Sequence, residues 1–291
     1  MAGSFLVHKL GAQAYWLYLP TAAGPAPLPL IVMLHGCGQT AVEFAQGTRM
    51  NQQAQQRCAV LYPEQSRSAN SMRCWNWFEP EALSGAADTA QIVHQIRDAQ
   101  ERYALDPKRC HVAGFSAGAA MAAVLCSTHP ALFARCAMHS GLMAQAASSL
   151  AEAVNFMRHG VTGDALERSV QRMLALLGTP PHTVPTLVIH GSQDMVVNPV
   201  NARQIGDQLQ LIATRVHAAG VEPVFSTERW VEDSGRAYRL QQMTLDGVLL
   251  LRSILIEGLG HAWSGGDPRH EYFDAVGPDA TALILEFLLQ Q

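Results

Sequence analysis

The sequence predicts an α/β protein with a mostly parallel central sheet and helices on both faces of that sheet. Short apolar runs alternate with longer stretches of helical periodicity along most of the 291 residues. The run PLIVML is apolar at every position, as expected of a central strand that is buried on both faces. Because the chain shows no internal repeat, low-complexity tract or linker, the sequence predicts a single domain over residues 1–291.

The order of the expected elements follows from these patterns. Strands are expected at residues 15–19, 30–34, 59–62, 110–115, 135–139 and 186–190, and a hairpin at 238–245 and 248–257 around Asp246-Gly247. Helices are expected at residues 40–57, 86–103, directly after Ser116, 200–219 and 278–289. Residues 142–183 break the alternation, with helical periodicity at 166–177, so they are expected to form an insertion over the sheet edge and a candidate lid.

Composition narrows the class of function. Hydrophobic residues make up 48% and charged residues 15% of the chain, which suits a large core. The net charge of −4 offers no basic surface for nucleic acid, and no apolar run is long enough to span a membrane. The start, MAGSFLVHKL, lacks the long apolar segment of a secretory signal. Six cysteines without a C-x-x-C pair, and histidines without ligand spacing, predict no metal site.

The stretch GFSAG is a candidate nucleophile turn. It lies between an apolar strand and an Ala-rich helix, which puts Ser116 at a sharp strand-to-helix corner. Glycines leave room for a strained turn that exposes the serine hydroxyl at the end of the strand. The same pattern also occurs in ordinary glycine-rich turns, so the assignment depends on partners elsewhere in the chain.

A nucleophilic serine needs a histidine base and a carboxylate that orients it, which in this fold follow later strands in the order acid, then histidine. Asp194 follows the apolar run TLVIH, and His261 follows ILIEGLG. Asp194 alone could instead be a helix N-cap. The other late candidates lie in a helix, a hairpin turn, a charged stretch or away from any clear strand: Asp164, Asp207, Asp233, Asp246, His217 and His270.

An oxyanion hole needs two N–H donors aimed at the developing negative charge. The residue after the nucleophile, Ala117, is expected to supply one of them. The loop HGCGQ after an early strand is expected to supply the other from the Cys37 backbone, although His35-Gly36 could also be a plain strand-end turn. We therefore expect Ser116, Asp194 and His261 to act with the Cys37 and Ala117 N–H groups.

Five motifs together resemble the esterase family of poly(3-hydroxybutyrate) depolymerases, which is related to feruloyl and acetylxylan esterases. They are HGCGQT, YPEQSRSAN, CWNWF, GFSAGAAMA and GLGHAWSGG, and the resemblance runs from about Tyr15 to the C-terminus. It implies an α/β-hydrolase fold, the triad Ser116, Asp194 and His261, and ester hydrolysis without a cofactor. It also implies a disulfide between Cys37 and Cys74, and an extracellular or periplasmic location, with a cytoplasmic one as the alternative.

The resemblance also bears on the substrate. Trp75, Trp77, Trp263 and Gln39 lie in or beside the motifs and are expected to bind it, although each tryptophan could equally be a core residue. The expected substrate is a 3-hydroxyalkanoate oligomer or polymer, with a feruloyl or acetyl ester of plant polysaccharide as the alternative. The absence of a separate anchoring domain in this sequence favours a soluble ester over a solid granule. A peptidase and a non-catalytic binding protein are the more distant alternatives. The oligomeric state stays open.

Overall fold

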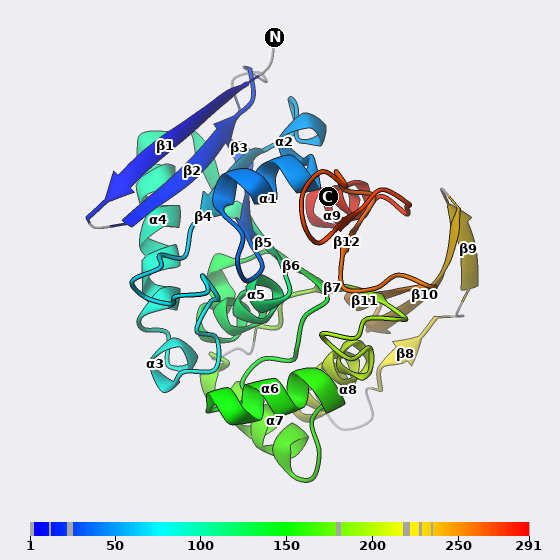
Figure 1. Cartoon of the computed structure of the whole chain (residues 1–291). Coiled ribbons are helices and arrows are strands. Elements are labelled where there is room, and N and C mark those ends of the chain that lie inside the picture. The colour runs from blue at the N-terminus through cyan, green and yellow to red at the C-terminus, as the bar shows by residue number, and fades with distance from the viewer. Residues whose placement is uncertain are drawn as a thin grey trace.

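The computed structural model describes residues 3–11, 13–21, 26–178, 182–217, 222–226, 229–233 and 235–290. Within these residues one sheet of eleven strands forms the centre of the molecule (Figure 1). In spatial order its strands are β1 (Ser4–Leu10), β2 (Gln13–Leu19), β4 (Ala59–Pro63), β3 (Leu28–Leu34), β5 (Leu105–Phe115), β6 (Arg135–His139), β7 (Thr186–Gly191), β11 (Val248–Ile256), β10 (Arg236–Leu245) and β8 (Val224–Phe225), with β9 (Arg229–Asp233) also paired to β10.

The middle of the sheet is parallel and its edges are antiparallel. From β4 through β3, β5, β6 and β7 to β11, every neighbouring pair runs parallel. The hairpins β1–β2 and β10–β11 close the two sides. This confirms the predicted fold class. Since parallel strands share one carboxyl edge, the residues that follow β3, β5 and β7 meet there.

Helices cover both faces of the sheet (Figure 1). One face carries α1 (Ala41–Thr48), α2 (Met50–Gln53) and α9 (Ala280–Leu289). The other carries α3 (Pro80–Leu83), α4 (Asp88–Arg102), α5 (Ala117–Thr128), α6 (Leu150–His159), α7 (Ala165–Leu176) and α8 (Val200–Val216). The remaining elements are the 3-10 turn η1 (Pro130–Leu132) and the short pair β12 (Trp263–Ser264) and β13 (Phe273–Asp274).

Strand β3 shows how the core forms on both sides. Its side chains alternate between faces, so Leu30 and Val32 join the cluster under α4 and α5. Ile31 and Met33 join the cluster under α1 and α9. All four are fully buried. A strand with two buried faces has no polar positions, which is why its sequence reads as a continuous apolar run.

The structure corrects two of the expected elements. The helix expected at residues 40–57 is two helices, because Arg49 takes a left-handed conformation (φ 55°) and ends α1 with its N–H bonded to the Gln46 carbonyl. The helix expected at 200–219 ends at Val216, and residue 219 lies outside the described residues. Strand β1 and helix α6 were not expected. β1 pairs with β2 as a hairpin, from Leu10 opposite Gln13 to Ser4 opposite Leu19.

The described part of segment 142–183 belongs to the helical layer. The Asn201 side chain of α8 donates to the Phe156 and Met157 carbonyls at the end of α6, at 3.1 and 3.2 Å. The Gln208 side chain of α8 reaches Ser169 of α7. These bonds fasten the segment to α8, and a role as a lid stays a prediction.

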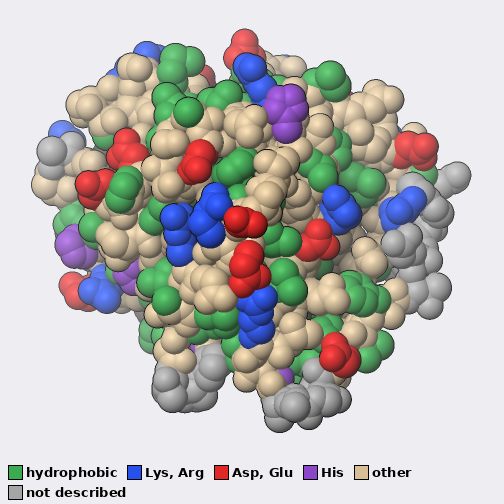
Figure 2. Space-filling view, turned by 90° about the horizontal axis from the view of Figure 1, so that it is seen from below, with side chains coloured by type: hydrophobic (Ala, Val, Ile, Leu, Met, Phe, Trp, Pro, Cys, Tyr) green, Lys and Arg blue, Asp and Glu red, His purple; other side chains and the backbone are tan. Residues whose placement is uncertain are grey.

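None of the described helices is long and apolar enough to cross a bilayer. The face in Figure 2 carries basic and acidic side chains interspersed with apolar ones rather than one continuous basic area.

Candidate active site

Ser116 occupies a strained turn between β5 and α5. Its backbone has φ 55° and ψ −120°, and its N–H donates to the His139 carbonyl at 2.9 Å. The flanking glycines are needed because the chain passes itself closely. A Cβ at Gly114 would lie 2.3 Å from the Gly118 backbone, and one at Gly118 would lie 2.1 Å from the Leu34 carbonyl oxygen. The turn therefore presses the start of α5 against the end of β3.

The structure brings Ser116, His261 and Asp194 into one hydrogen-bonded chain. His261 Nε2 lies 3.0 Å from Ser116 Oγ, and His261 Nδ1 lies 2.8 Å from Asp194 Oδ2. The loops that carry the acid and the histidine are joined by their backbones, since the Gln193 N–H donates to the Leu259 carbonyl at 2.9 Å. This is the geometry that lets a histidine take a proton from a serine while a carboxylate fixes its tautomer.

Asp194 is buried but held in its ionised form. Burial by itself raises the pKa of this carboxyl, but the hydrogen bonds from His261 and the Val197 N–H outweigh it and leave the pKa below its usual range. Its second oxygen, Oδ1, accepts the Val196 and Val197 N–H groups at 2.9 and 2.8 Å. The negative charge needed to orient His261 is therefore available at neutral pH.

Two buried histidines surround this chain and were not singled out from the sequence. His190 Nε2 lies 2.8 Å from the Val197 carbonyl and 3.5 Å from Asp194. The ring of His139 stacks on Trp263 at 5.1 Å and accepts the Ser264 N–H at 3.4 Å. Burial lowers the pKa of both, to about 3 for His139, so both are neutral packing groups. They lie at strand ends, and this position was their only signal in the sequence.

The loop after β3 is held rigidly beside Ser116. His35 Nδ1 donates to the Gly36 carbonyl at 2.8 Å, and His35 Nε2 accepts the Gln65 N–H at 3.1 Å. Burial lowers the pKa of His35 to about 4, so it stays neutral. The Gln39 side chain accepts the Gly36 N–H at 2.9 Å and reaches the Glu271 carbonyl at 3.4 Å. His35 and Gln39 thus shape the loop by their own hydrogen bonds.

The remaining N–H groups of this region suit an oxyanion hole. The Gly38 N–H is used by the Met72 carbonyl at 2.8 Å. In the described part of the chain, the Cys37 and Ala117 N–H groups donate no hydrogen bond. A disulfide joins Cys37 to Cys74 and ties this loop to the segment that follows β4. Free donors on a braced loop can stabilise negative charge without reorganising.

The tryptophans are a correction to the sequence analysis. Trp75 and Trp263 are 0% exposed and Trp77 is 7% exposed, so none offers a ring face to a substrate. Their indole groups serve the core, because Trp75 donates to the His35 carbonyl at 3.1 Å and Trp263 donates to Thr281 at 3.1 Å. The tryptophans belong to motifs that also carry candidate site residues, but their rings point into the core.

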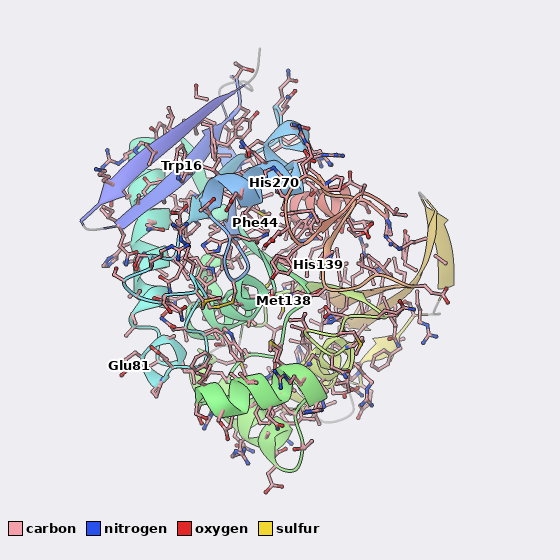
Figure 3. The ribbon with its side chains drawn as sticks, viewed as in Figure 1. Trp16, Phe44, Glu81, Met138, His139 and His270 are labelled. Carbon is pink, nitrogen blue, oxygen red and sulfur yellow. A yellow bond between two sulfur atoms is a disulfide. The ribbon has the colours of Figure 1, made fainter. Side chains whose placement is uncertain are left out.

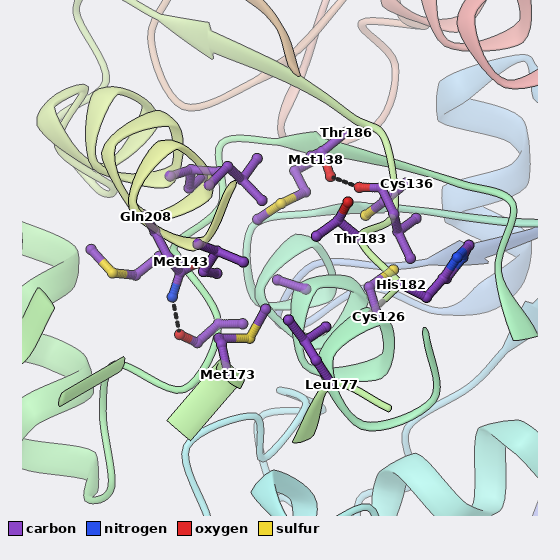
Figure 4. A pocket seen from close by; sticks show the side chains of 16 residues that line it. Cys126, Cys136, Met138, Met143, Met173, Leu177, His182, Thr183, Thr186 and Gln208 are labelled. Atoms are coloured by element: carbon purple, nitrogen blue, oxygen red, sulfur yellow. Dashed lines mark hydrogen bonds between the residues drawn. The ribbon is translucent and has the colours of Figure 1, made fainter. Parts of the chain in front are cut away.

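An apolar cavity lies elsewhere, between α5, α7, α8 and the sheet (Figure 4). Its volume is about 40 Å³, room for roughly one water molecule. Its lining includes Cys126, Cys136 and Met143, and it contains none of Ser116, Asp194 and His261. It is a packing void of the helical layer. In the described part of the chain, no group of three or more His, Cys, Asp or Glu side chains is placed to hold a metal ion.

Comparison with known proteins adds the family. Residues 13–232 match the family model described as esterase PHB depolymerase. The chain is 30% identical over 241 residues to poly(3-hydroxyalkanoate) depolymerase C of Paucimonas lemoignei, covering 81% of this chain and 55% of that relative. It is 26% identical over 197 residues to feruloyl esterase B of Thermothelomyces thermophilus, covering 65% and 66% of the two chains. The chain thus spans little more than half the length of the depolymerase it matches.

The solved structures place the fold. An acetyl xylan esterase from Aspergillus awamori superposes with a TM-score of 0.73 at 20% identity, covering 89% of this chain and 94% of the other. At that identity the likeness speaks for the fold alone, which is the α/β-hydrolase fold. The family match covers well over half of the sequence and agrees with the resemblance that the motifs carry. The chain belongs to the esterase PHB depolymerase family.

Proposed function

We propose that this protein is a serine esterase that hydrolyses carboxylic esters through an acyl-enzyme. The observation that carries the proposal is the hydrogen-bonded chain Ser116–His261–Asp194 at the carboxyl edge of the sheet. Ser116 Oγ attacks the ester carbonyl while His261 Nε2 takes its proton. Asp194 keeps the other ring nitrogen protonated and stabilises the imidazolium. The Cys37 and Ala117 N–H groups bind the oxyanion.

The second half of the reaction uses the same groups. His261 returns its proton to the leaving alcohol oxygen, which departs and leaves the acyl group on Ser116. His261 then takes a proton from water, and the resulting nucleophile attacks the acyl carbonyl. Collapse of that intermediate returns the proton to Ser116 Oγ and releases the acid. We take the whole chain as one hydrolase domain, because both buried clusters share the same sheet.

The substrate we propose is a soluble 3-hydroxyalkanoate oligomer or polymer segment. The name of the relative from Paucimonas lemoignei supports it. A feruloyl or acetyl ester of plant polysaccharide is the second candidate, supported by the names of the feruloyl esterase and the acetyl xylan esterase. The Cys37–Cys74 disulfide favours an oxidising compartment, extracellular or periplasmic.

The test compares hydrolysis of 3-hydroxybutyrate oligomers, methyl ferulate and p-nitrophenyl acetate by the wild type and Ser116→Ala. We expect the variant to lose activity on every ester while its circular dichroism is unchanged. Ser140→Ala is the matched control, since Ser140 also follows a strand with positive φ (54°), but its hydroxyl is hydrogen-bonded to His139 Nδ1 at 3.1 Å. A fluorophosphonate should label Ser116 alone. Substantial activity in Ser116→Ala would contradict the proposal.

A further inference from the structure

A groove of about 430 Å³ opens beside the oxyanion loop. One wall is the loop itself, residues 37–39, with Glu43 of α1 and Met72 beside it. The other wall is the segment 269–273. Figure 3 shows His270 of that segment near Phe44 of α1, and Phe273 contacts both rings. Cys37, the residue to which we assign an oxyanion donor, is among the residues that line this groove.

Two apolar side chains stand exposed in this groove. Met72 is 65% and Tyr272 is 45% exposed, whereas the expected tryptophans are buried. Met72 is fixed to the oxyanion loop through its carbonyl, which accepts the Gly38 N–H, and through the nearby Cys37–Cys74 disulfide. Exposed apolar side chains on opposite walls of a polar groove are the arrangement found in sites for small organic groups.

Tyr272 is held in place against its backbone preference. Its φ of 66° lies in the left-handed region, which a bulky side chain rarely adopts. Its neighbours hold this conformation, because the Tyr272 carbonyl accepts the Trp263 N–H at 2.7 Å and the next residue, Phe273, is buried against Gly47. Such strain persists only where the surroundings fix it, and it often accompanies a functional role. Here it turns the Tyr272 ring outward.

The position of the ring tells which part of the ester it meets. The Tyr272 ring centre lies 6.1 Å from that of His261, with the planes near perpendicular at 75°. His261 must hand its proton to the leaving oxygen, so the alcohol part of the ester departs on the side of His261. A ring beside His261, in a groove that is lined in part by Cys37, therefore faces the alcohol part.

The charges in the groove indicate an uncharged ligand. Hydrogen bonds from Thr40 hold the pKa of Glu43 below its usual range, so this carboxylate is ionised. The guanidinium of Arg269 is paired with Asp267, at 2.9 and 3.1 Å from its Nε. The groove is thus lined by two acidic side chains, Glu43 and Glu271, by His270, and by an Arg269 that is paired with Asp267. An alcohol part that carries a carboxylate would be repelled.

We infer that this groove is the subsite for the alcohol part of the ester, that it takes uncharged aromatic or apolar alcohols, and that Tyr272 is its specificity-determining wall. The inference rests on the proposed esterase function and adds the side of the scissile bond. For a polyester it means that a neutral internal segment is preferred over a terminal unit that bears a free carboxylate.

The test uses acetates of one acyl group and different alcohols. Tyr272→Ala should lower kcat/KM for 2-naphthyl acetate about ten-fold, because an aromatic contact and its buried area are lost. The kcat/KM for methyl acetate should change less than two-fold. The deacylation rate of the common acetyl-enzyme, measured from burst kinetics, should not change, because the alcohol has left. Tyr272→Phe should behave as wild type, and Met72→Ala should show a smaller loss of the same kind.

Leu150→Ala is the control, since Leu150 is 63% exposed and does not line the groove. An equal loss on both acetates, or a change in deacylation, would overturn the inference. Binding of 2-naphthol to Ser116→Ala, followed by naphthol fluorescence, separates the two proposals. If the wild type hydrolyses no ester but naphthol binding weakens in Tyr272→Ala, the esterase function and the alcohol assignment fall together, and the groove remains only a site for neutral aromatic groups. If hydrolysis is intact and naphthol binding ignores Tyr272, the subsite falls.

Discussion

Gly118 is the position where a single methyl group should separate the two oxyanion donors. A Cβ there would lie 2.1 Å from the Leu34 carbonyl oxygen and 2.6 Å from that of His35. Contacts under 3.0 Å are not sustained, so the start of α5 and the end of β3 must move apart by about 1 Å. Both obstacles are backbone atoms, which cannot rotate away as a side chain can. Ala117 lies on one side of this contact and Cys37 follows the other.

The expected size of the effect follows from that shift. A displacement of about 1 Å in a catalytic constellation costs roughly 10²-fold in rate, close to the loss of one oxyanion donor. We therefore expect Gly118→Ala to lower kcat/KM for p-nitrophenyl acetate about 100-fold, equivalent to about 2.7 kcal/mol. The overpacked contact should also reduce the free energy of unfolding by about 1–3 kcal/mol.

The assay is ester hydrolysis alongside urea unfolding of the same preparations. Gly178→Ala serves as the control, because no atom of the described residues lies within 4 Å of a Cβ built at Gly178 and its φ is not in the left-handed region. That variant should keep wild-type activity and stability. Wild-type kcat/KM in Gly118→Ala would refute the reasoning, since it would mean that the packing of α5 on β3 does not set the positions of the donors.

Two further predictions concern charge. Asp194→Asn should lower kcat by about 10³- to 10⁴-fold with an unchanged circular dichroism spectrum, because an amide leaves His261 in the wrong tautomer. Activity within ten-fold of wild type on p-nitrophenyl acetate would show that another acid orients His261. Stability should fall as the pH drops from 6.5 towards 4, because unfolded His35 binds a proton there while the buried ring, with its pKa of about 4, does not. His35 contributes at most about 3 kcal/mol to this loss of stability. Urea unfolding at pH 7 and pH 4.5 measures the free energy of unfolding, which sums the effect of all titrating groups and must decrease on acidification.

The groups to which we assign the reaction have signals in the sequence because their positions depend on topology. Ser116, Asp194 and His261 each follow an apolar strand, and strands with parallel neighbours bring their carboxyl ends to one edge. A strand can be recognised from its own residues, so each of these positions has a local signal. The fold class was confirmed for the same reason. The helix that begins at residue 40 was predicted too long, because the end of α1 depends on the left-handed conformation of Arg49, which the periodicity of the sequence does not reveal.

The groups that surround the reaction have no such local signal. Trp75 and Trp263 share motifs with candidate site residues, but the direction of each ring is set by partners far away in the chain, His35 and Thr281. Tyr272 shows the converse case. Its exposure accompanies a positive φ that contacts with Trp263 and Phe273 hold in place, so nothing in DPRHEYFD distinguishes Tyr272 from the other residues of this loop.

The oxyanion loop joins these two kinds of information. HGCGQ could be read from the sequence as a candidate donor loop, but part of its rigidity comes from residues 30 or more positions from their partners in the loop. Gln65 fixes the His35 ring, Trp75 holds the His35 carbonyl and Met72 engages Gly38. Stabilisation of an oxyanion depends on donors that are aimed before the charge appears. Sequence motifs therefore identify which groups can react, while the contacts between distant segments decide whether those groups are positioned well enough to do so, and which alcohol can leave.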